Sequence, residues 1–210
     1  LRRSAQRVCQ WPGPELRQPG TITRVDLENM GLIVKGDPRL VSRVTTVQDG
    51  KTLLISTRGM FVSVSKQAAV TMELSVPKIS MLQTDGSGDI SLRGFRQTVV
   101  ELFQNGNGNI VAEGSFQEIH ASLQGSGNIH LKGQAVQLQL RTQGSGDLSA
   151  AELMTDNAVL ICHGSGNTSV SVKDHLTIQL SGSGNVSVSG NPVNKKIDKK
   201  GSGQIIWKNN

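Results

Sequence analysis

One glycine-rich motif recurs seven times in this chain of 210 residues, and its regular spacing constrains the fold more than any other feature. The motif begins at residues 86, 106, 125, 144, 164, 182 and 201, where the sequence is GSGD, GNGN, GSGN, GSGD, GSGN, GSGN and GSGQ. Because each interval is about 19 residues, the chain is expected to fold as a stack of similar units. A collagen helix is excluded because glycine does not recur at every third residue.

Apolar and polar residues alternate on both sides of each motif. When the first glycine is counted as position zero, positions +4, +6, −4 and −6 are mainly apolar and positions +5, +7 and −5 mainly polar. Position +4, for example, holds Ile90, Ile110, Ile129, Leu148, Thr168, Val186 and Ile205. A period of two is typical of half-buried strands. Each repeat is therefore predicted to be a strand, a glycine corner and a strand, with a second turn often marked by Gly94, Gly114, Gly133 and Gly190.

The connection from one strand to its equivalent is a full repeat, and no stretch between the strands has helical periodicity. Equivalent strands are then expected to pair in parallel. We predict an all-β fold, a right-handed single-stranded parallel β-helix with rungs of about 19 residues, because parallel crossovers are nearly always right-handed. The left-handed six-residue repeat is disfavoured because the intervals vary from motif to motif and are not a fixed multiple of six.

Each corner motif ends in an amide or carboxylate side chain. These are Asp89, Asn109, Asn128, Asp147, Asn167, Asn185 and Gln204. Stacked one rung apart, such side chains are expected to hydrogen-bond along the stack, and the glycines to supply positive φ angles at the turn. Calcium between the rungs is the alternative. It is disfavoured because only Asp89 and Asp147 are acidic, whereas calcium prefers six or more clustered oxygens.

The chain is expected to have two parts. Residues 1–24, with five arginines and three prolines, are predicted to form a basic tail, and they lack the apolar segment of a signal peptide. Residues 25–210 are predicted to be one β-helix domain, with an irregular N-terminal β cap region over 25–78 and regular rungs over 79–210. Candidate strands of the cap region are Leu32–Val34, Leu40–Val47, Thr52–Thr57, Phe61–Val64 and Val70–Val76.

Local turn signals support this division. Asp49-Gly50 is a hairpin-type signal, and Pro77 is expected to end the last strand before the regular rungs. Caps are expected because a bare end exposes unpaired strand edges and apolar core. Trp207, at position +6 of the last motif, is predicted to fill the core at the C-terminal end.

The net charge of +6 lies at the two ends, because residues 1–24 and 191–210 each carry a net +4. A polyanion partner, such as a membrane surface, an acidic glycan or nucleic acid, is one interpretation. Specific nucleic-acid binding is disfavoured because aromatic residues are only 3% of the chain. The favoured interpretation is that Lys195, Lys196, Lys199 and Lys200 form a solvated end that discourages rods from stacking.

The order of these signals resembles one bacterial family, the putative auto-transporter adhesin, head GIN domain family. The resemblance is carried by VTMELSVPKISMLQTDGSGDISLRG (Val70–Gly94), the repeated GSG[DN] corners, NKKIDKKGSGQIIW (Asn194–Trp207) and VQDGKTLLIST (Val47–Thr57). It covers roughly residues 25–210. The resemblance implies a right-handed single-stranded β-helix, usually exported from the cytoplasm, with no catalytic residues.

No arrangement in the sequence predicts catalytic residues, a cofactor or a metal site. Glu101 and His120 are neighbours one rung apart and are interpreted as an exposed charge pair. Arg93, Glu113 and Lys132 alternate in sign and are interpreted as a surface ladder. No column holds the paired carboxylates of a glycosidase. No metal site is predicted, since no two of the four histidines share a column; these are His120, His130, His163 and His175.

The two cysteines are interpreted structurally. Cys162 lies at the inward position −2 and is expected to be a buried, inert thiol. A disulfide with Cys9 is the alternative, and it requires the tail to reach the inside of a rung. Asn167 and Asn185 fit the glycosylation pattern but are assigned to the corner ladder.

The function expected is that of a non-enzymatic, exported protein, adhesin-like and periplasmic or at the outer membrane or cell surface. It would present a flat face to a glycan, a polymer or a protein. The flattest candidate face is that of positions +5 and +7, where the last rungs carry Ser169, Ser171, Ser187 and Ser189. A structural or assembly subunit without a ligand is the alternative, and a polysaccharide-active enzyme is a weaker one.

Overall fold

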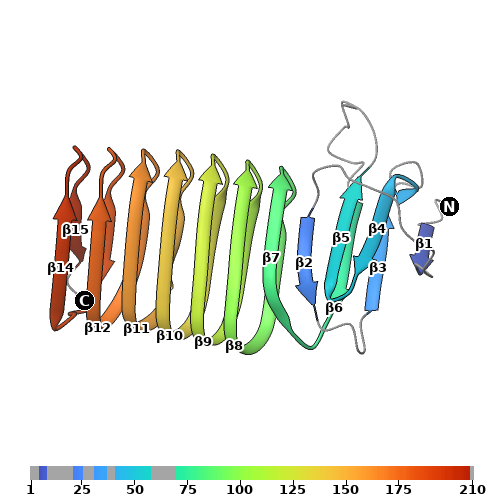
Figure 1. Cartoon of the computed structure of the whole chain (residues 1–210), viewed down its shortest axis with the longest axis horizontal. Helices are drawn as coiled ribbons and strands as arrows, with labels where there is room; N and C mark the ends of the chain where they lie inside the picture. The colour runs from blue at the N-terminus through green and yellow to red at the C-terminus, as the bar shows by residue number, and fades with distance from the viewer. Residues whose placement is uncertain (1–4, 9–20, 26–30, 37–40, 58–69, 209–210) are drawn as a thin grey trace. The chain divides into compact units, whose positions relative to one another are not determined.

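The structure, a computed structural model, describes residues 5–8, 21–25, 31–36, 41–57 and 70–208 (Figure 1). The chain forms two compact units, Leu1–Ile79 and Ser80–Asn210. Each unit is described by itself below. Within the described residues, no helix has both the length and the apolar character needed to cross a membrane.

The second unit is a stack of parallel coils. Its strands are β7 (Ile79–Gly86), β8 (Ile90–Gly106), β9 (Asn109–Gly125), β10 (Asn128–Gly144), β11 (Leu148–Gly164), β12 (Thr168–Leu180), β13 (Val186–Ser189), β14 (Asn194–Lys199) and β15 (Ile205–Lys208). Strands β7 to β12 pair in sequence order, β14 pairs with β12, and β15 follows β13; every pairing is parallel. This order confirms the predicted parallel β-solenoid.

Strands β8 to β11 have 17 residues each because one extended segment passes around both sides of a coil. Figure 1 shows each of them run along the back, bend at the lower edge and return along the front to a short corner at the upper edge. We call the upper edge, formed by the GSG[DN] motifs, the corner edge and the lower one the bend edge. The predicted second turn is therefore a bend within a continuous strand.

The core lies between the two sides of the coils and consists of the predicted inward columns. In the middle coils the residues at +4, +6, −4 and −6 are buried, as in the column Val100, Ile119, Leu138, Ala158 and Leu176. The register aligns these columns, with Ile129 beside Ile110 and Leu148 beside Ile129. Burial of each Leu or Ile side chain contributes about 1.5–3 kcal/mol to the stability of the fold. Because every coil adds such residues, the core is thin but its stabilisation grows with each coil.

The corner glycines are required mainly because neighbouring coils approach closely. At the first glycine of a motif φ is positive in four cases, as at Gly106 (φ 138°). The second glycine needs no such angle, yet a Cβ on Gly146 would lie 1.8 Å from the carbonyl oxygen of Gly127 in the coil before. The expectation of positive φ thus accounts for part of the motif, and the contact between stacked backbones accounts for the rest.

The predicted ladder of corner side chains is present. The side-chain oxygen of Asn128 accepts from the backbone N–H of Asp147 at 3.0 Å, and Asp147 accepts from the N–H of Asn167 at 2.7 Å. Asn185 and Gln204 continue the pattern. Because Asp147 and Asp89 already accept hydrogen bonds from the next coil, their oxygens are used in stacking, which supports the ladder over the calcium alternative.

The first unit contains two antiparallel groups of strands. One is β1 (Ala5–Val8), β3 (Gly31–Gly36) and β6 (Val70–Ser75), and the other is β2 (Thr21–Val25), β5 (Thr52–Thr57) and β4 (Val44–Asp49). The β4–β5 turn confirms the Asp49-Gly50 hairpin, with Gly50 at φ 55°. Strands β1 and β2 carry pairing into residues 1–24, the segment expected to be a tail. The candidate strand Phe61–Val64 lies outside the described residues.

The prediction that Trp207 fills the C-terminal core is wrong. Trp207 pairs with the buried Val188, as its column requires, but its side chain is 40% exposed. The Lys195 ammonium lies 4.5 Å from the centre of its ring. The physical reason is position: β15 belongs to the last coil of the described chain, where inward residues have a neighbouring coil on one side alone.

Candidate functional site

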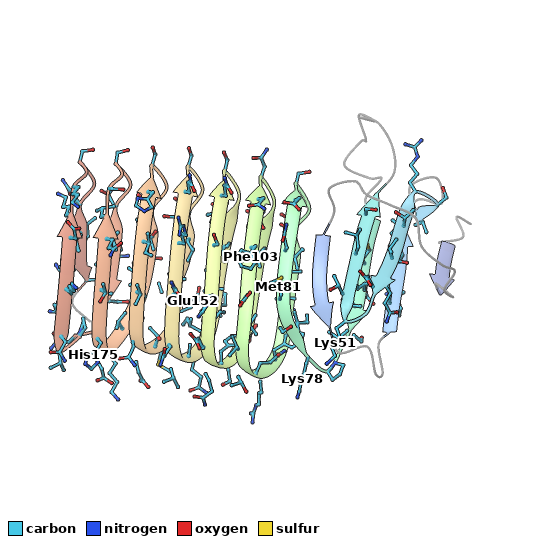
Figure 2. The ribbon with its side chains drawn as sticks, in the orientation of Figure 1. Lys51, Lys78, Met81, Phe103, Glu152 and His175 are labelled. Carbon is cyan, nitrogen blue, oxygen red and sulfur yellow. The ribbon has the colours of Figure 1, made fainter. Side chains whose placement is uncertain are left out.

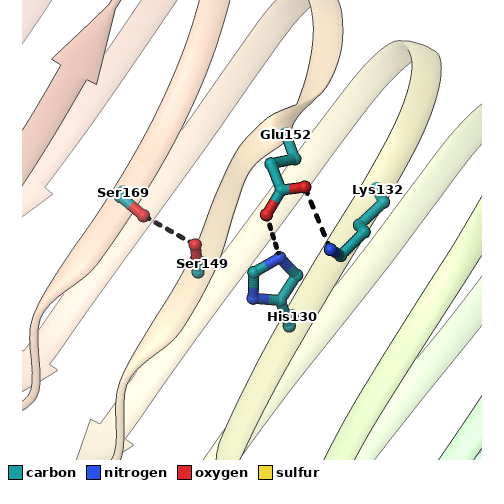
Figure 3. A network of polar contacts seen from close by, with 5 residues as sticks. All are labelled: His130, Lys132, Ser149, Glu152 and Ser169. Atoms are coloured by element: carbon teal, nitrogen blue, oxygen red, sulfur yellow. Dashed lines mark hydrogen bonds and ion pairs between the residues drawn. The ribbon is translucent and has the colours of Figure 1, made fainter.

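The outward columns at +5 and +7 carry one polar network, centred on Glu152 (Figure 3). Glu152 Oε1 lies 2.8 Å from His130 Nε2, and Glu152 Oε2 accepts from Lys132 Nζ at 2.9 Å. Beside it, Ser169 Oγ donates to Ser149 Oγ at 3.0 Å. The Lys132 and His130 hydrogen bonds lower the pKa of the Glu152 carboxyl below its usual value.

This network corrects the predicted charge ladder. Lys132 is the register neighbour of Glu113, as its column predicts, but its ion pair is with Glu152 of the next coil. The cause is a register shift between β10 and β11, which pairs His130 with Ser149 and Lys132 with Glu152 and so passes over Ala151. The repeat that contains Ala151 is one residue longer than the repeat before it, and the extra residue brings the carboxylate to the lysine.

The predicted contact of Glu101 with His120 is also corrected. The two residues are register neighbours, but His120 Nε2 pairs with Glu118 Oε1, two residues earlier on its own strand, at 2.6 Å. Both side chains are more than a third exposed. Since exposed ion pairs contribute little free energy, this contact adds little to the stability of the fold.

The serine and histidine side chains of these outward columns bond to neighbouring side chains, and within the described residues Ser149 and His130 have different partners. Ser149 is bonded to Ser169, and the imidazole of His130 is bonded to a carboxylate. His163 contacts Ser181, and His175, near the bend edge in Figure 2, contacts Asn194. Over the described ranges no group of three or more acidic, histidine or cysteine side chains could hold a metal ion.

Cys162 is a free, buried thiol, as its column predicts. Its Sγ lies 3.4 Å from Thr168 Oγ1, and burial raises the pKa of the thiol. A raised pKa keeps the sulfur protonated and therefore unreactive. Cys9, its alternative partner, lies outside the described residues.

The predicted serine-rich face is present but shallow. Ser169, Ser171, Ser187 and Ser189 are half-buried, and Ser189 Oγ donates to the Val170 carbonyl oxygen. The opposite side of the coils carries Met81 and Phe103 (Figure 2), both half-buried, among polar neighbours. Of the four serines, Ser171 also lines the groove described next.

A groove of about 910 Å³ runs along the bend edge. Its floor is one row of register neighbours, one from each of five coils: Gln97, Phe116, Ala135, Thr155 and Val172. All but Gln97 are buried. Because parallel strands lie about 4.8 Å apart, four steps give a floor roughly 19 Å long.

The rims of the groove are polar and mostly uncharged. One rim is a second register row: Arg96, Ser115, Gln134, Met154 and Ser171. The other includes Thr98, Gln117, Val136, Asp156 and Lys173. Met154 is 69% exposed, the highest value among the large apolar residues of the described coils apart from Val193. The groove thus offers a floor that is apolar and buried at Phe116, Ala135 and Val172, between hydroxyl and amide groups, with few charges.

Sequence reasoning missed this groove because its residues do not align when counted from the corners. Val172 lies at position +8 and Thr155 at +11, yet they are register neighbours. Differences in coil length are absorbed at the bend, which shifts the count there. The available signal was the uncharged run after the bend in the two middle repeats, Ser115–Gln117 and Gln134–Gln137, which contrasts with the charged Glu113 and Lys132 at +7.

Comparison with known proteins gives one family match and similar solved structures. A family model described as "Putative auto-transporter adhesin, head GIN domain" matches residues 21–192. A crystal structure of a putative adhesin from Bacteroides fragilis is 20% identical, with a TM-score of 0.79, and the match covers 86% of this chain and 83% of that one. A putative lipid binding protein from Parabacteroides distasonis is also 20% identical, with a TM-score of 0.60 and 87% and 86% covered. Curated proteins give no match.

Proposed function

The chain belongs to the putative auto-transporter adhesin, head GIN domain family, and from this premise we propose that it is a non-enzymatic binding protein of the cell envelope or surface. Its coils present a site to a glycan, a polymer or a protein. We place the site in the groove at the bend edge rather than on the serine-rich face. Its location is exported, either periplasmic or at the outer membrane or cell surface, as the family description and the adhesin-like relative suggest.

The proposal rests on the way in which successive coils line the groove. Each coil contributes one floor residue and one residue to each rim, at the spacing of the strands. A linear molecule lying along the stack would therefore meet one floor residue and two rim residues at every step, with side chains that differ from coil to coil. A binding site for drug-sized ligands usually measures about 300–1,000 Å³, and this groove reaches the upper end of that range.

The lining favours an uncharged ligand with both apolar and hydroxyl or amide groups. Arg96 and Lys173 stand near opposite ends of the groove and Asp156 is of the other sign, so no column of like charge attracts a polyanion. Amide and hydroxyl side chains such as Gln134 and Ser115 can donate and accept hydrogen bonds. A neutral glycan has this chemistry, and it is the first ligand to test.

Three alternatives make different predictions. A structural or assembly subunit would associate with itself and bind none of these ligands. A polysaccharide-active enzyme would cleave its ligand, and substitution of an outward acid such as Glu101 would abolish the cleavage. A lipid ligand, suggested by the name of one relative, would occupy the apolar floor and be insensitive to the loss of rim amides.

The test is an array of glycans, envelope polymers and lipids probed with the purified chain at low and high salt. The groove variant combines Gln134→Ala with Met154→Ala, both exposed on one rim. The matched control combines Gln139→Ala with Val159→Ala, exposed on the same two strands outside the groove. Two contacts of about 1 kcal/mol each would weaken binding at least about tenfold in the groove variant.

Salt-resistant binding that the groove variant loses and the control keeps would support the proposal. Binding that disappears at high salt would place the interaction at the basic ends of the chain. Binding that both double variants keep would remove the groove as the site. No binding to any glycan, polymer or lipid would favour the structural role.

A further inference from the structure

The last coil of the described chain leaves one edge of its strands unpaired. β14 pairs with β12 and β15 with β13, and no described strand pairs with their other edge. Among the described residues, the backbone donors and acceptors that point to that edge have no strand partner. Such an edge is a template for another strand, and proteins add strands from partners in this way.

The inward columns of β14 differ in charge from those of every earlier coil. Lys195 and Lys199 occupy the positions that pair with the buried Leu176 and Leu180 of β12. Between them is Ile197, beside the buried Ile178 and itself 45% exposed. A strand added to the open edge would place its own inward side chains directly over these three residues.

The two inward lysines are held in different ways. Lys195 Nζ lies 4.5 Å from the centre of the Trp207 ring, a cation–π contact that covers part of the apolar end. Lys199 makes no ion pair with a described residue, and Lys200 pairs with Asp198 at 3.3 Å. An acidic side chain opposite Lys199 would find an unpaired ammonium beside an unpaired backbone edge.

Charge and backbone chemistry together select the occupant. A second copy stacking through the same end would set two surfaces of net +4 against each other, which like-charge repulsion disfavours. A membrane could attract the lysines but supplies no regular row of donors and acceptors for the edge. An extended polypeptide supplies that row, and acidic residues supply the counter-charge.

We propose that the terminal coil is a docking site for a β-strand of an acidic partner polypeptide. The strand adds in parallel to β14 and continues over β15. Its inward side chains are acidic opposite Lys195, apolar opposite Ile197 and acidic opposite Lys199. Opposite Ile205 and Trp207 they are apolar. This interface is separate from the groove, and the two can be tested independently.

The probe is the synthetic peptide ETVTETGSGNVTVT, which follows the terminal coil residue for residue from Lys195 to Lys208. The control peptide TEVETTGSGNVTVT has the same composition, but its glutamates occupy the outward positions. Binding is measured by fluorescence polarisation of the labelled peptide and, in the Trp11→Phe variant, by the emission of Trp207, whose contact with Lys195 the peptide acids would change. Amide hydrogen exchange along β14 reports whether the edge becomes paired.

The protein variants separate register from general charge. Lys195→Gln and Lys199→Gln remove inward charges, while the control Lys196→Gln removes the same charge from the outward side of β14. We expect each inward variant to weaken peptide binding about two- to fivefold, as cross-strand ion pairs do, and Lys196→Gln to have a smaller effect. The first peptide should slow exchange of the β14 amides more than the control peptide does.

Three outcomes would overturn the proposal. Equal binding of the two peptides, or equal losses for Lys195→Gln and Lys196→Gln, would show attraction by net charge alone. Unchanged exchange of the β14 amides on saturation would show that no strand adds. Binding to vesicles of mixed anionic and neutral lipid, without binding to either peptide, would assign the end to a membrane surface instead.

Discussion

Substitution of alanine for the second corner glycine should be severe in the middle of the stack and harmless at its start. A Cβ on Gly146 would lie 1.8 Å from the carbonyl oxygen of Gly127 and 2.9 Å from its carbonyl carbon. Both are backbone atoms, which no side-chain rotation can move away. At the equivalent position of the first corner, Gly88 has nothing within 4 Å of an added Cβ and no positive φ. The same change in the same motif therefore differs only in whether a coil lies beneath it.

The magnitude follows from the contacts around Gly146. Real Cβ atoms do not approach other atoms within 3.0 Å, so the corner must move far enough to open the 1.8 Å contact to that distance. That shift would stretch the bonds that Ser145 and Gly146 donate to the Gly125 carbonyl oxygen and the bond from the Asp147 N–H to Asn128. At about 1 kcal/mol for each bond, with strain added, the cost is roughly 2–4 kcal/mol. Alanine at the unhindered Gly88 instead restricts the unfolded chain and should stabilise by up to about 1 kcal/mol.

Thermal and urea unfolding of the two variants test this reasoning. For a chain of this size the midpoint of Gly146→Ala should fall by roughly 5–15 °C relative to the wild type. Stacked repeats do not always unfold in a single step, so the comparison of midpoints, rather than an extrapolated free energy, is the measurement. If Gly146→Ala and Gly88→Ala unfold at the same temperature, close approach of the coils is not the reason for the second glycine.

Three further substitutions or treatments have expected outcomes. Asn128→Ala removes a side-chain acceptor from the corner ladder and should lower stability by about 1 kcal/mol, measured by urea unfolding, whereas an unchanged midpoint would mean that water replaces the bond without loss. Glu152 has a lowered pKa, so its contribution to stability is present above its unfolded pKa and is lost as pH falls through the lower folded value. Unfolding curves of the wild type and Glu152→Gln should therefore differ at neutral pH and converge in acid; a constant difference would contradict the assignment. Cys162 should resist alkylation at pH 8 until the protein is denatured, as followed by mass spectrometry of its peptide, and labelling of the native chain would show that the thiol is accessible.

The repeat and its inward columns could be predicted because their period is enforced by stacking. Every coil has to place an apolar residue over the one before, so Leu140 and Leu160 recur at the same distance from their glycines. The corner ladder followed in the same way, since Asn128 and Asp147 differ by one repeat. Each of these features recurs once in every coil, so a count along the sequence is enough to find them.

The features that were missed depend on where a coil departs from the repeat. Counting could not locate the extra residue between Gly144 and Gly164, which the structure places at Ala151, and so it did not find Glu152 as the ion-pair partner of Lys132. Trp207 obeys its column but lies in the last described coil, with a described coil on one side only, and this depends on its position in the stack rather than on the pattern. Strand β1 pairs with β3 and β2 with β5, and both partners are distant in sequence. The arginines and prolines of residues 1–24 led to the prediction of a tail instead of strands.

The same distinction indicates which surface of the coils can acquire a function. At the corner edge nearly every residue is dictated by stacking, because glycine backbones touch and the Asn or Asp oxygens are used by the next coil. A ligand could contact that edge, but substitution there to improve recognition would cost stability. The bend edge absorbs coils of different lengths, and its rim side chains, such as Gln134 and Met154, are exposed. Side chains at the bend can therefore change without disturbing the ladder, which makes the groove the part of the solenoid most free to specify a ligand.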